Sequence, residues 1–233
     1  MVTEACCTPA PPAAPTQVGK EEVLAGTKVY ITGSASASAA VIMINDVFGF
    51  DAPLLRKLAD KVAVEGGYFV VVPDVLKGDP FTGSFAAGDF GPWIAKHGAK
   101  DEALEMTRGV VEAVKDKGFG AVGCAGFCWG AKVAVCLGKE KDVRAVVQLH
   151  PSFVEKSDYE EVVVPIAVLA APTDGVEQYE ELLASRTEVK SFVKVFSDVR
   201  HGWTVRYEEN DENDVEKANE AHKLMLDWFA KYL

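Results

Sequence analysis

The sequence lacks several features that would assign it to a special class of protein. None of its apolar runs approaches the roughly 18 residues of a membrane-spanning helix. Positive charge is scarce, with 24 Lys and Arg against 35 Asp and Glu and a net charge of −11. Nucleic acids and anionic membranes are bound mainly through Lys and Arg, so we expect neither as a partner. The 233 residues suffice for one domain to bury a core without disulfide or metal support.

Disulfide, metal and cofactor signatures are also missing. Five cysteines are an odd number, so at least one thiol is unpaired within the chain. Cys124, Cys128 and Cys136 lie in the most apolar part of the sequence, which is typical of reduced thiols in a reducing compartment. Because neither a secretory signal nor a transit peptide is recognisable, we expect a cytoplasmic protein. No metal-ligand cluster, phosphate-binding glycine loop or dinucleotide fingerprint occurs, so we expect no metal and no cofactor.

The order of apolar segments predicts the fold class. Residues 1–24 open the chain with an Ala- and Pro-rich stretch that contains Cys6 and Cys7, and we expect a mobile tail there. In residues 25–233, apolar runs of strand length alternate with amphipathic runs of helix length, which predicts a single α/β domain with a mostly parallel sheet and helices on both faces. Strands are predicted at 29–31, 39–44, 68–72, 121–125, 145–149, 166–170 and 192–196, and helices at 53–66, 100–117, 129–137, 176–185 and from about 214.

One long segment interrupts this alternation. Residues 77–98 contain five glycines and two prolines together with Phe81, Phe85, Phe90 and Trp93. Long loops in compact domains are often functional, and exposed aromatic rings need a surface or a ligand to cover them. The sequence leaves two interpretations open for this segment, a wall of a substrate site or a loop packed on itself.

The motif Gly126-Phe127-Cys128-Trp129-Gly130 lies between a predicted strand and a predicted helix. This is the setting of a nucleophile elbow, with Cys128 in the position of the nucleophilic serine. The turn is sharp, and glycines two residues away on each side avoid collision with the crossing strand and helix. The helix N-terminus favours the thiolate, which is the reactive form. The alternative is that Cys128 is one more buried core cysteine.

A thiol nucleophile also needs a base, and chain order selects one. On this fold the order is nucleophile, acid, histidine. Only His150, His201 and His222 follow Cys128. We interpret His222 as part of the apolar stripe of the last helix and His150 as the structural end of a strand. His201, in a loop between the last strand and the last helix, is the predicted base.

The acid is predicted from its place after a strand. Asp174 follows the strand at 166–170, and loops at the carboxyl ends of parallel strands line the active crevice. Asp198 is a weaker alternative because it lies only three residues before His201, the side chain that it would have to orient. Cys128, Asp174 and His201 are therefore the predicted catalytic triad.

These residues resemble the dienelactone hydrolase (carboxymethylenebutenolidase) family of α/β-hydrolases. The resemblance extends from about Lys28 to the C-terminus and implies the α/β-hydrolase fold. It includes plant relatives labelled endo-1,3-1,4-β-D-glucanase, which share the Cys-Cys and Pro-rich opening. It rests on the elbow motif at 126–130, Asp174-Gly175, His201-Gly202-Trp203 and Asn45-Asp46-Val47-Phe48-Gly49.

The resemblance implies roles for further residues. The family position that matches Asp46 is typically a Glu that contacts the thiol before the substrate arrives, and Asp46 is one methylene shorter. The backbone N–H groups of Val47 and Trp129 are implied to form the oxyanion hole, in agreement with the general rule for this fold.

Two arginines are candidates for binding a carboxylated substrate, because bacterial members of the family use arginines in this way. Arg206 lies near the position where one such arginine is expected, and Arg200 is the other candidate. Alternatively, both could be surface residues paired with the acidic run at 208–216. The net charge of −11 makes a local positive site necessary for any anionic substrate.

The function predicted from these residues is hydrolysis of a small ester or lactone through a thioester acyl-enzyme, with Phe81, Phe85 and Trp93 among the substrate contacts. One alternative is a glycoside hydrolase that uses Asp46 and Asp174. Another is a binding protein without catalysis, and the last is a redox role for Cys124 and Cys128. The protein is expected to act as a monomer or a homodimer.

Overall fold

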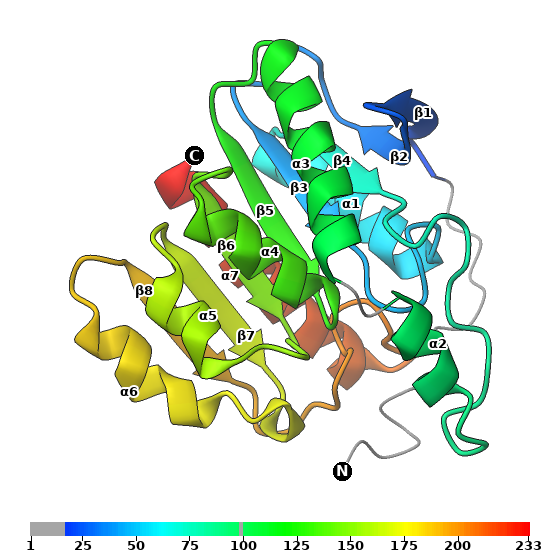
Figure 1. Ribbon diagram of the computed structural model, residues 1–233, viewed down its shortest axis with the longest axis vertical. Helices are drawn as coiled ribbons and strands as arrows, with labels where there is room; N and C mark the ends of the chain where they lie inside the picture. Colours follow the sequence, from blue (N-terminus) through cyan, green and yellow to red (C-terminus); the bar gives the residue numbers. More distant parts are fainter. Residues whose placement is uncertain (1–16, 98–99) are drawn as a thin grey trace.

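The computed structural model describes residues 17–97 and 100–233, and these form one eight-stranded sheet. The strand order is β1-β2-β4-β3-β5-β6-β7-β8 (Figure 1). β1 and β2 pair antiparallel with their neighbours, and all pairs from β4 to β8 are parallel. The strands are β1 (Lys20–Leu24), β2 (Thr27–Thr32), β3 (Ala40–Ile44), β4 (Phe69–Pro73), β5 (Val122–Phe127), β6 (Ala145–Leu149), β7 (Ile166–Ala170) and β8 (Ser191–Val195).

Helices cover both faces of the sheet (Figure 1). One core contains apolar side chains of α3 to α6, and a second core, on the other face, contains those of α1 and α7. The central strands β3 to β7 are buried along almost their whole length, as expected for parallel strands covered on two sides. The helices are α1 (Pro53–Gly66), α2 (Phe90–His97), α3 (Lys100–Asp116), α4 (Gly130–Lys139), α5 (Lys156–Glu161), α6 (Glu177–Ser185) and α7 (Glu212–Tyr232).

The predicted α/β class is confirmed, and every predicted strand and helix is present with shifts of a few residues at its ends. Local signals account for the agreement. Pro53 starts α1, where its missing N–H costs nothing, and Gly67 ends that helix with a φ of 69°, which glycine adopts without strain.

The expected tail at residues 1–24 requires a correction. Lys20–Leu24 form β1, which pairs with β2 at the edge of the sheet. Glu21 also forms an ion pair of 2.7 Å with Arg56, whose side chain is only 6% exposed. Residues 20–24 therefore belong to the sheet. Cys6 and Cys7 lie outside the described residues.

The segment at 77–98 is also more ordered than a loop. Its second half forms α2, although the sequence there carries glycine and proline. The short helix α5 was not predicted either, because six residues are too few to display a helical period.

Strand register places the residues of the candidate site at the carboxyl ends of neighbouring parallel strands. Ile44 at the end of β3 lies opposite Gly126 of β5, and Phe127 lies opposite Leu149 of β6. Leu149 in turn lies opposite Leu169 of β7. The segments that follow these four parallel strands consequently emerge side by side, where ligands bind in open α/β sheets.

Candidate active site

Cys128 occupies a strained turn between β5 and α4. Its φ is 51°, in the left-handed region that non-glycine residues rarely adopt. A Cβ atom on Gly126 would lie 2.4 Å from the carbonyl oxygen of Gly130, and one on Gly130 would lie 2.4 Å from that of Ile44. Backbone atoms cannot move aside as a flexible side chain can. Both glycines are therefore required by the close approach of β3, β5 and α4 at this turn.

His201 and Asp174 are joined by a short hydrogen bond. His201 Nδ1 lies 2.6 Å from Asp174 Oδ1, and the Asp174 side chain is 1% exposed. The other carboxylate oxygen of Asp174 accepts a hydrogen bond of 2.7 Å from the N–H of Ala171. The alternative acid, Asp198, instead pairs with Lys217 of α7 at 3.1 Å. The acid placed to orient His201 is thus Asp174.

The charges of Cys128 and His201 stabilise each other. Burial alone would raise the pKa of the Cys128 thiol, but the charge and hydrogen bond of His201, with the charge of Arg206, lower it. Burial likewise opposes the charged imidazole, yet Cys128 and Asp174 raise the pKa of His201 to about 10. The charged forms, a thiolate and an imidazolium, therefore favour each other, and a thiolate is the reactive form of a cysteine nucleophile.

Asp46 and Arg206 form a second buried charged pair next to this one. The Asp46 carboxylate lies 3.4 Å from Arg206 Nη1, and both side chains are 4% exposed or less. Asp46 also accepts a hydrogen bond of 2.9 Å from the N–H of Phe48, whose ring lies under the Arg206 guanidinium at 5.0 Å. The negative charge of Asp46 raises the pKa of the Cys128 thiol, opposite to the effect of Arg206. The two members of this pair therefore have opposite effects on the pKa of the Cys128 thiol.

The two candidate arginines differ in their surroundings. Arg206 is buried, and its guanidinium fills the space where a Cβ of Gly202 would stand, at 1.9 Å. The surface interpretation is thus wrong for Arg206, which forms an ion pair with Asp46. Arg200 is half-buried and donates a hydrogen bond of 2.6 Å to the carbonyl oxygen of Arg206. Arg200 thereby supports the backbone that carries Arg206.

The expected oxyanion-hole donors lie on the two segments that meet at the elbow. Trp129 directly follows Cys128 at the start of α4, where backbone N–H groups have no acceptor within the helix. Val47 follows β3, and its carbonyl oxygen accepts a hydrogen bond of 2.8 Å from the N–H of Phe81. This bond ties the aromatic segment to the β3–α1 loop. Both residues remain candidates for the oxyanion hole.

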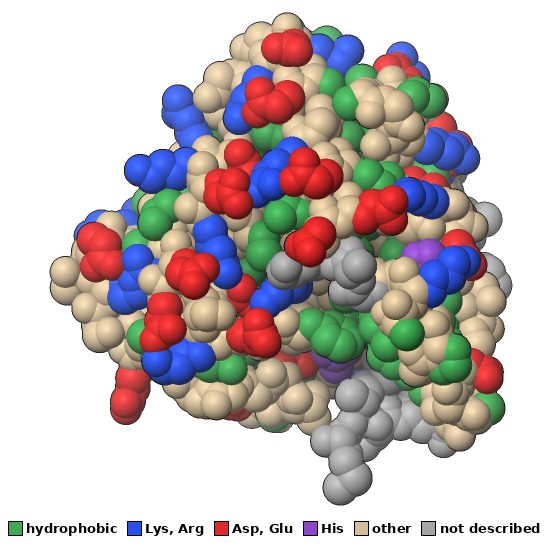
Figure 2. Space-filling view, in the orientation of Figure 1, with side chains coloured by type: hydrophobic (Ala, Val, Ile, Leu, Met, Phe, Trp, Pro, Cys, Tyr) green, Lys and Arg blue, Asp and Glu red, His purple; other side chains and the backbone are tan. Residues whose placement is uncertain are grey.

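The aromatic side chains of the segment at 77–98 form a cluster beside this loop. Phe81 is buried at its centre, with its ring 4.5 Å from Phe85 and 5.6 Å from Trp93. Phe48 contacts Phe81 and Phe85, which links the cluster to Arg206. Figure 2 shows hydrophobic side chains gathered around α2, whereas charged side chains of both signs alternate over α3 and α4. Phe81 is buried inside this cluster, while Phe85 and Trp93 are partly exposed.

Sequence reasoning missed the residues that follow β6. Ser152 Oγ lies 3.6 Å from Cys128 Sγ, and Phe153 is 52% exposed with a φ of 60°. His150 is buried, and its ring centroid lies 5.0 Å from that of His201. The position after a parallel strand, which singled out Asp174, would also have singled out this segment.

Other groups in the described residues do not form a second centre. Cys124 and Cys136 are buried and in no disulfide within the described residues, and burial raises the pKa of Cys124 strongly. Residues 17–97 and 100–233 contain no group of three or more His, Cys, Asp or Glu side chains arranged to hold a metal ion. Within the same part of the chain, no helix combines the length and apolar character needed to cross a membrane.

A mostly parallel sheet with a strained nucleophile turn after one strand, an acid after a later strand and a histidine before the last helix defines the α/β-hydrolase class. Sequence comparison narrows this class. The profile of the dienelactone hydrolase family matches residues 27–233, and the chain belongs to that family of hydrolases.

Individual relatives agree with this assignment. An endo-1,3;1,4-β-D-glucanase of Zea mays is 41% identical over 170 residues, which are 70% of this chain and 54% of the maize protein. The matched region thus spans about half of that relative. A carboxymethylenebutenolidase homolog of Mus musculus is 28% identical. The match covers 93% of this chain and 92% of the mouse protein. The crystal structure of dienelactone hydrolase from Anabaena variabilis has a TM-score of 0.70 at 16% identity, covering 92% of this chain and 99% of that one.

Proposed function

We propose that this protein hydrolyses a small ester or lactone by nucleophilic catalysis through Cys128. The observation that carries the proposal is the contact of 2.6 Å between His201 and Asp174, whose side chain is 1% exposed, combined with the lowered pKa of a thiol at a strained elbow. A buried cysteine without a catalytic role would have its pKa raised, as Cys124 does. The names of the family and of its animal relatives support the same chemistry.

In the first half of the reaction, the Cys128 thiolate attacks the carbonyl carbon of the substrate and forms the new C–S bond. The negative charge moves to the carbonyl oxygen, which the N–H groups of Val47 and Trp129 stabilise. When the tetrahedral intermediate collapses, the C–O bond breaks and His201 gives its proton to the departing alkoxide oxygen. In a lactone the alcohol produced remains attached to the acyl group.

In the second half, water hydrolyses the thioester. Neutral His201 removes a proton from water, whose oxygen attacks the acyl carbon. The C–S bond breaks, the carboxylic acid leaves, and Cys128 returns as a thiolate beside protonated His201. Asp174 holds the imidazole orientation through both steps and stabilises its positive charge. No further reactant is needed, because water supplies both the hydroxyl group and the proton.

The substrate contacts follow from the walls around the sulfur. Phe85 and Trp93 offer partly exposed aromatic surface to an apolar acyl or alcohol group. Arg206 is our candidate for a substrate carboxylate, because its Nε has no hydrogen-bond partner although the side chain is buried. A carboxylate would compete with Asp46 for this guanidinium, whose contact with Asp46 is long at 3.4 Å.

The name of the maize relative raises glucan hydrolysis as an alternative. That chemistry normally uses two carboxyl groups on either side of the scissile bond. Here both oxygens of Asp174 are engaged, by His201 and the N–H of Ala171, and Asp46 is paired with Arg206. Asp174 is thus occupied by His201, the charge of Asp46 faces a buried guanidinium, and a thiolate has no part in the usual mechanism. We therefore favour ester or lactone hydrolysis.

The proposal is tested by replacing the nucleophile. Cys128→Ala is expected to reduce hydrolysis of a model aryl ester and a model lactone at least about a thousandfold, because the covalent route is lost. Cys136→Ala removes a buried thiol from α4 and serves as the matched control, with activity close to that of the unchanged protein. Mass spectrometry after rapid quenching should detect the acyl group on the peptide that contains Cys128.

Three outcomes would count against the proposal. Full ester or lactone turnover by Cys128→Ala would exclude the thiolate as nucleophile. Absence of any acyl adduct on Cys128, together with ligand binding that survives the substitution, would indicate a binding protein instead. Release of reducing sugar from a β-glucan that persists in Cys128→Ala and is lost in Asp46→Asn would support the glucanase alternative.

A further inference from the structure

The loop between β6 and α5 is attached directly to the nucleophile turn. The N–H of Cys128 donates to the carbonyl oxygen of Leu149 at 3.0 Å, and the N–H of Ser152 donates to that of Cys128 at 3.0 Å. The Ser152 hydroxyl oxygen lies 3.6 Å from the Cys128 sulfur. Two backbone contacts and one side-chain contact therefore fix Ser152 relative to the sulfur.

Strain on either side of Ser152 indicates that its position matters. His150 has a φ of 40° and Phe153 a φ of 60°, both in the left-handed region that bulky residues rarely adopt. Phe153 is 52% exposed, so burial of its ring does not account for its conformation. Residues held in such conformations are concentrated at active sites, where the surrounding structure maintains them for function.

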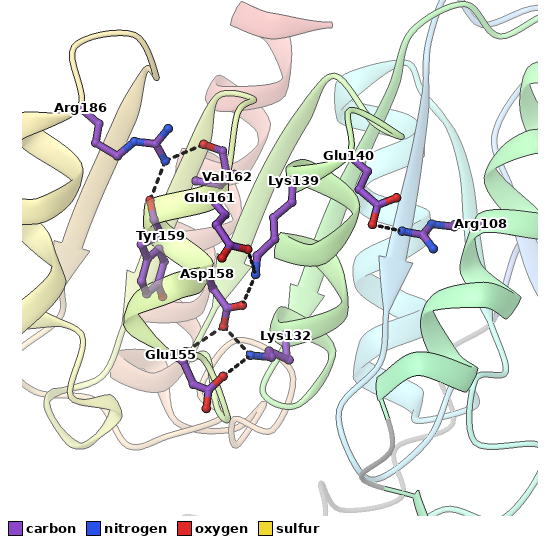
Figure 3. Close-up of polar contacts among 10 residues, drawn as sticks. All are labelled: Arg108, Lys132, Lys139, Glu140, Glu155, Asp158, Tyr159, Glu161, Val162 and Arg186. Atoms are coloured by element: carbon purple, nitrogen blue, oxygen red, sulfur yellow. Dashed lines mark hydrogen bonds and ion pairs between the residues drawn. The ribbon is translucent and has the colours of Figure 1, made fainter.

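The far end of the same loop is tied to α4, the helix that follows Cys128 (Figure 3). Lys132 of α4 contacts Glu155 at 3.0 Å and Asp158 at 2.7 Å, and Lys139 contacts Asp158 at 2.8 Å. The Asp158 side chain is 1% exposed, so this network is buried at its centre. The loop is thus held to the nucleophile segment at both ends, and the Ser152 hydroxyl is positioned before any substrate binds.

We propose that Ser152 is a positioning residue whose hydroxyl is the second hydrogen-bond partner of the Cys128 sulfur, beside His201, and favours its thiolate form. The proposal rests on the proposed function of Cys128. When Cys128 and His201 are both uncharged, the thiol donates to the Ser152 hydroxyl oxygen at 3.6 Å. Once His201 holds the proton, the hydroxyl rotates and donates its own hydrogen to the thiolate. The hydroxyl keeps its proton throughout.

The charged groups around the sulfur explain why a neutral donor is useful there. His201 and Arg206, both on the segment between β8 and α7, favour the thiolate. Asp46, on the segment after β3, opposes it, and burial opposes it further. His150, which lies against His201, is kept neutral because burial lowers its pKa. A hydroxyl group stabilises the thiolate by a hydrogen bond and adds no further charge to the site.

The test measures the rate at which iodoacetamide alkylates Cys128 as a function of pH in the full-length protein. Tandem mass spectrometry assigns the label to Cys128 itself, because no Lys or Arg separates it from Cys124 and both thiols lie in one tryptic peptide. In Ser152→Ala the rate at the acidic end of the profile is expected to fall roughly 3- to 10-fold, as for loss of one hydrogen bond to the reacting group. The plateau at alkaline pH should be unchanged, since the thiolate forms fully there in both proteins.

Three further variants distinguish the effect of losing the hydroxyl from a change in the folded structure. Ser152→Thr and Ser152→Val have nearly the same shape, so retention of the profile by Thr and its shift in Val would assign the effect to the hydroxyl. Ser157→Ala removes a serine hydroxyl from α5 and should leave the profile in place. Thermal unfolding of each variant shows whether it is folded.

Profiles for folded Ser152→Ala or Ser152→Val that superimpose on that of the unchanged protein would overturn the inference. So would equal shifts in Thr and Val, which would indicate a structural effect. Either result leaves the proposed function intact if Cys128→Ala still abolishes hydrolysis. Conversely, hydrolysis that survives in Cys128→Ala would refute the proposed function whatever the alkylation profiles show.

Discussion

At the scale of single residues, the hydrogen bond between Asp174 and His201 determines which nitrogen of the imidazole points away from the acid and stabilises the charged imidazole. In the proposed mechanism, a carboxylate that accepts a hydrogen bond from Nδ1–H leaves Nε2 as the atom that exchanges protons with the sulfur. It also stabilises the imidazolium, which contributes to the pKa of about 10 for His201. The identity of the acid is therefore open to a direct test.

Asp174→Asn is expected to lower kcat/KM for an aryl ester by about 10³- to 10⁴-fold, because an amide favours the wrong imidazole tautomer and does not stabilise its positive charge. Without that stabilisation, the pKa of His201 should decrease from about 10, and the thiolate should become protonated at a higher pH. Steady-state kinetics and the alkylation profile of Cys128 measure both effects.

The matched control is Asp198→Asn, which alters a carboxylate near His201 in the sequence but paired with Lys217. Its activity should stay within about twofold of the unchanged protein, since an exposed ion pair contributes little. A large loss in Asp198→Asn and a small one in Asp174→Asn would reverse the assignment of the acid.

The contact of Ser152 with the sulfur was not predicted, although the position of its segment after a parallel strand points to the site. Chain order and flanking strands predicted Cys128, Asp174 and His201, because these features are linear in the sequence. No local pattern distinguishes Ser152 from other loop serines. Its contact with the sulfur depends on how far the β6–α5 loop folds back over α4.

At the scale of elements, the elbow is where β3, β5 and α4 approach each other most closely. The Gly130 Cα atom faces the carbonyl oxygens of Ile44 and Asn45, and an added Cβ would lie 2.4 Å and 2.6 Å from them. These carbonyls belong to the segment that carries Asp46 and Val47. Packing at one glycine thus positions the nucleophile relative to the expected oxyanion hole.

Gly130→Ala is expected to lower the free energy of unfolding by about 2–4 kcal/mol, because α4 must shift away from the end of β3. Activity of the folded fraction should fall as well, since Trp129 moves with the helix. Urea denaturation and ester hydrolysis provide the two measurements.

Gly120→Ala is the comparison variant, because a Cβ there meets no atom within 4 Å. Its free energy of unfolding should change by no more than about 1 kcal/mol, and an increase is expected if the alanine restricts the unfolded chain. Equal destabilisation of both variants would show that the close approach at Gly130 is not the cause of the lower free energy of unfolding.

The elements that the sequence did not predict share a property. β1 is a short, half-exposed edge strand, α5 has six residues, and α2 follows a segment rich in glycine. Each has a weak local signal and is stabilised by contacts with distant parts of the chain, such as Lys132 with Asp158 for α5. Long buried strands and amphipathic helices are predictable because their own side chains carry the period.

At the scale of the whole molecule, the described residues before β2 are part of the folded unit. Arg56 of α1 is buried, and it contacts Glu21 of β1 at 2.7 Å and Gln17 at 3.0 Å. Its guanidinium also lies over the ring of Tyr30 at 4.8 Å. Removal of the N-terminal segment would therefore leave a buried positive charge without its acidic partner.

A chain that begins at residue 25 is expected to lose at least about 2 kcal/mol of unfolding free energy, because the buried Arg56 guanidinium loses its acidic partner and an edge strand is lost too. Urea denaturation of the shortened and complete chains checks this value. Glu21→Gln in the complete chain should show a smaller loss that isolates the charge.

Glu22→Gln gives the reference for an exposed pair. Glu22 contacts Lys20, whose side chain is 75% exposed, so its removal should change the free energy of unfolding by less than about 0.5 kcal/mol. If the chain that begins at residue 25 were as stable as the complete one, β1 would have no role in stability.

The sequence by itself determined the α/β class and the order of the central strands along the chain, and it predicted Cys128, Asp174 and His201 as nucleophile, acid and histidine, since periodicity and chain order are linear properties. The tertiary structure alone decided that Arg206 is buried against Asp46 and that Ser152 touches the sulfur. It also decided that residues 20–24 complete the sheet. These contacts join segments that are distant in the chain, and their formation depends on strand register and helix packing rather than on any local pattern.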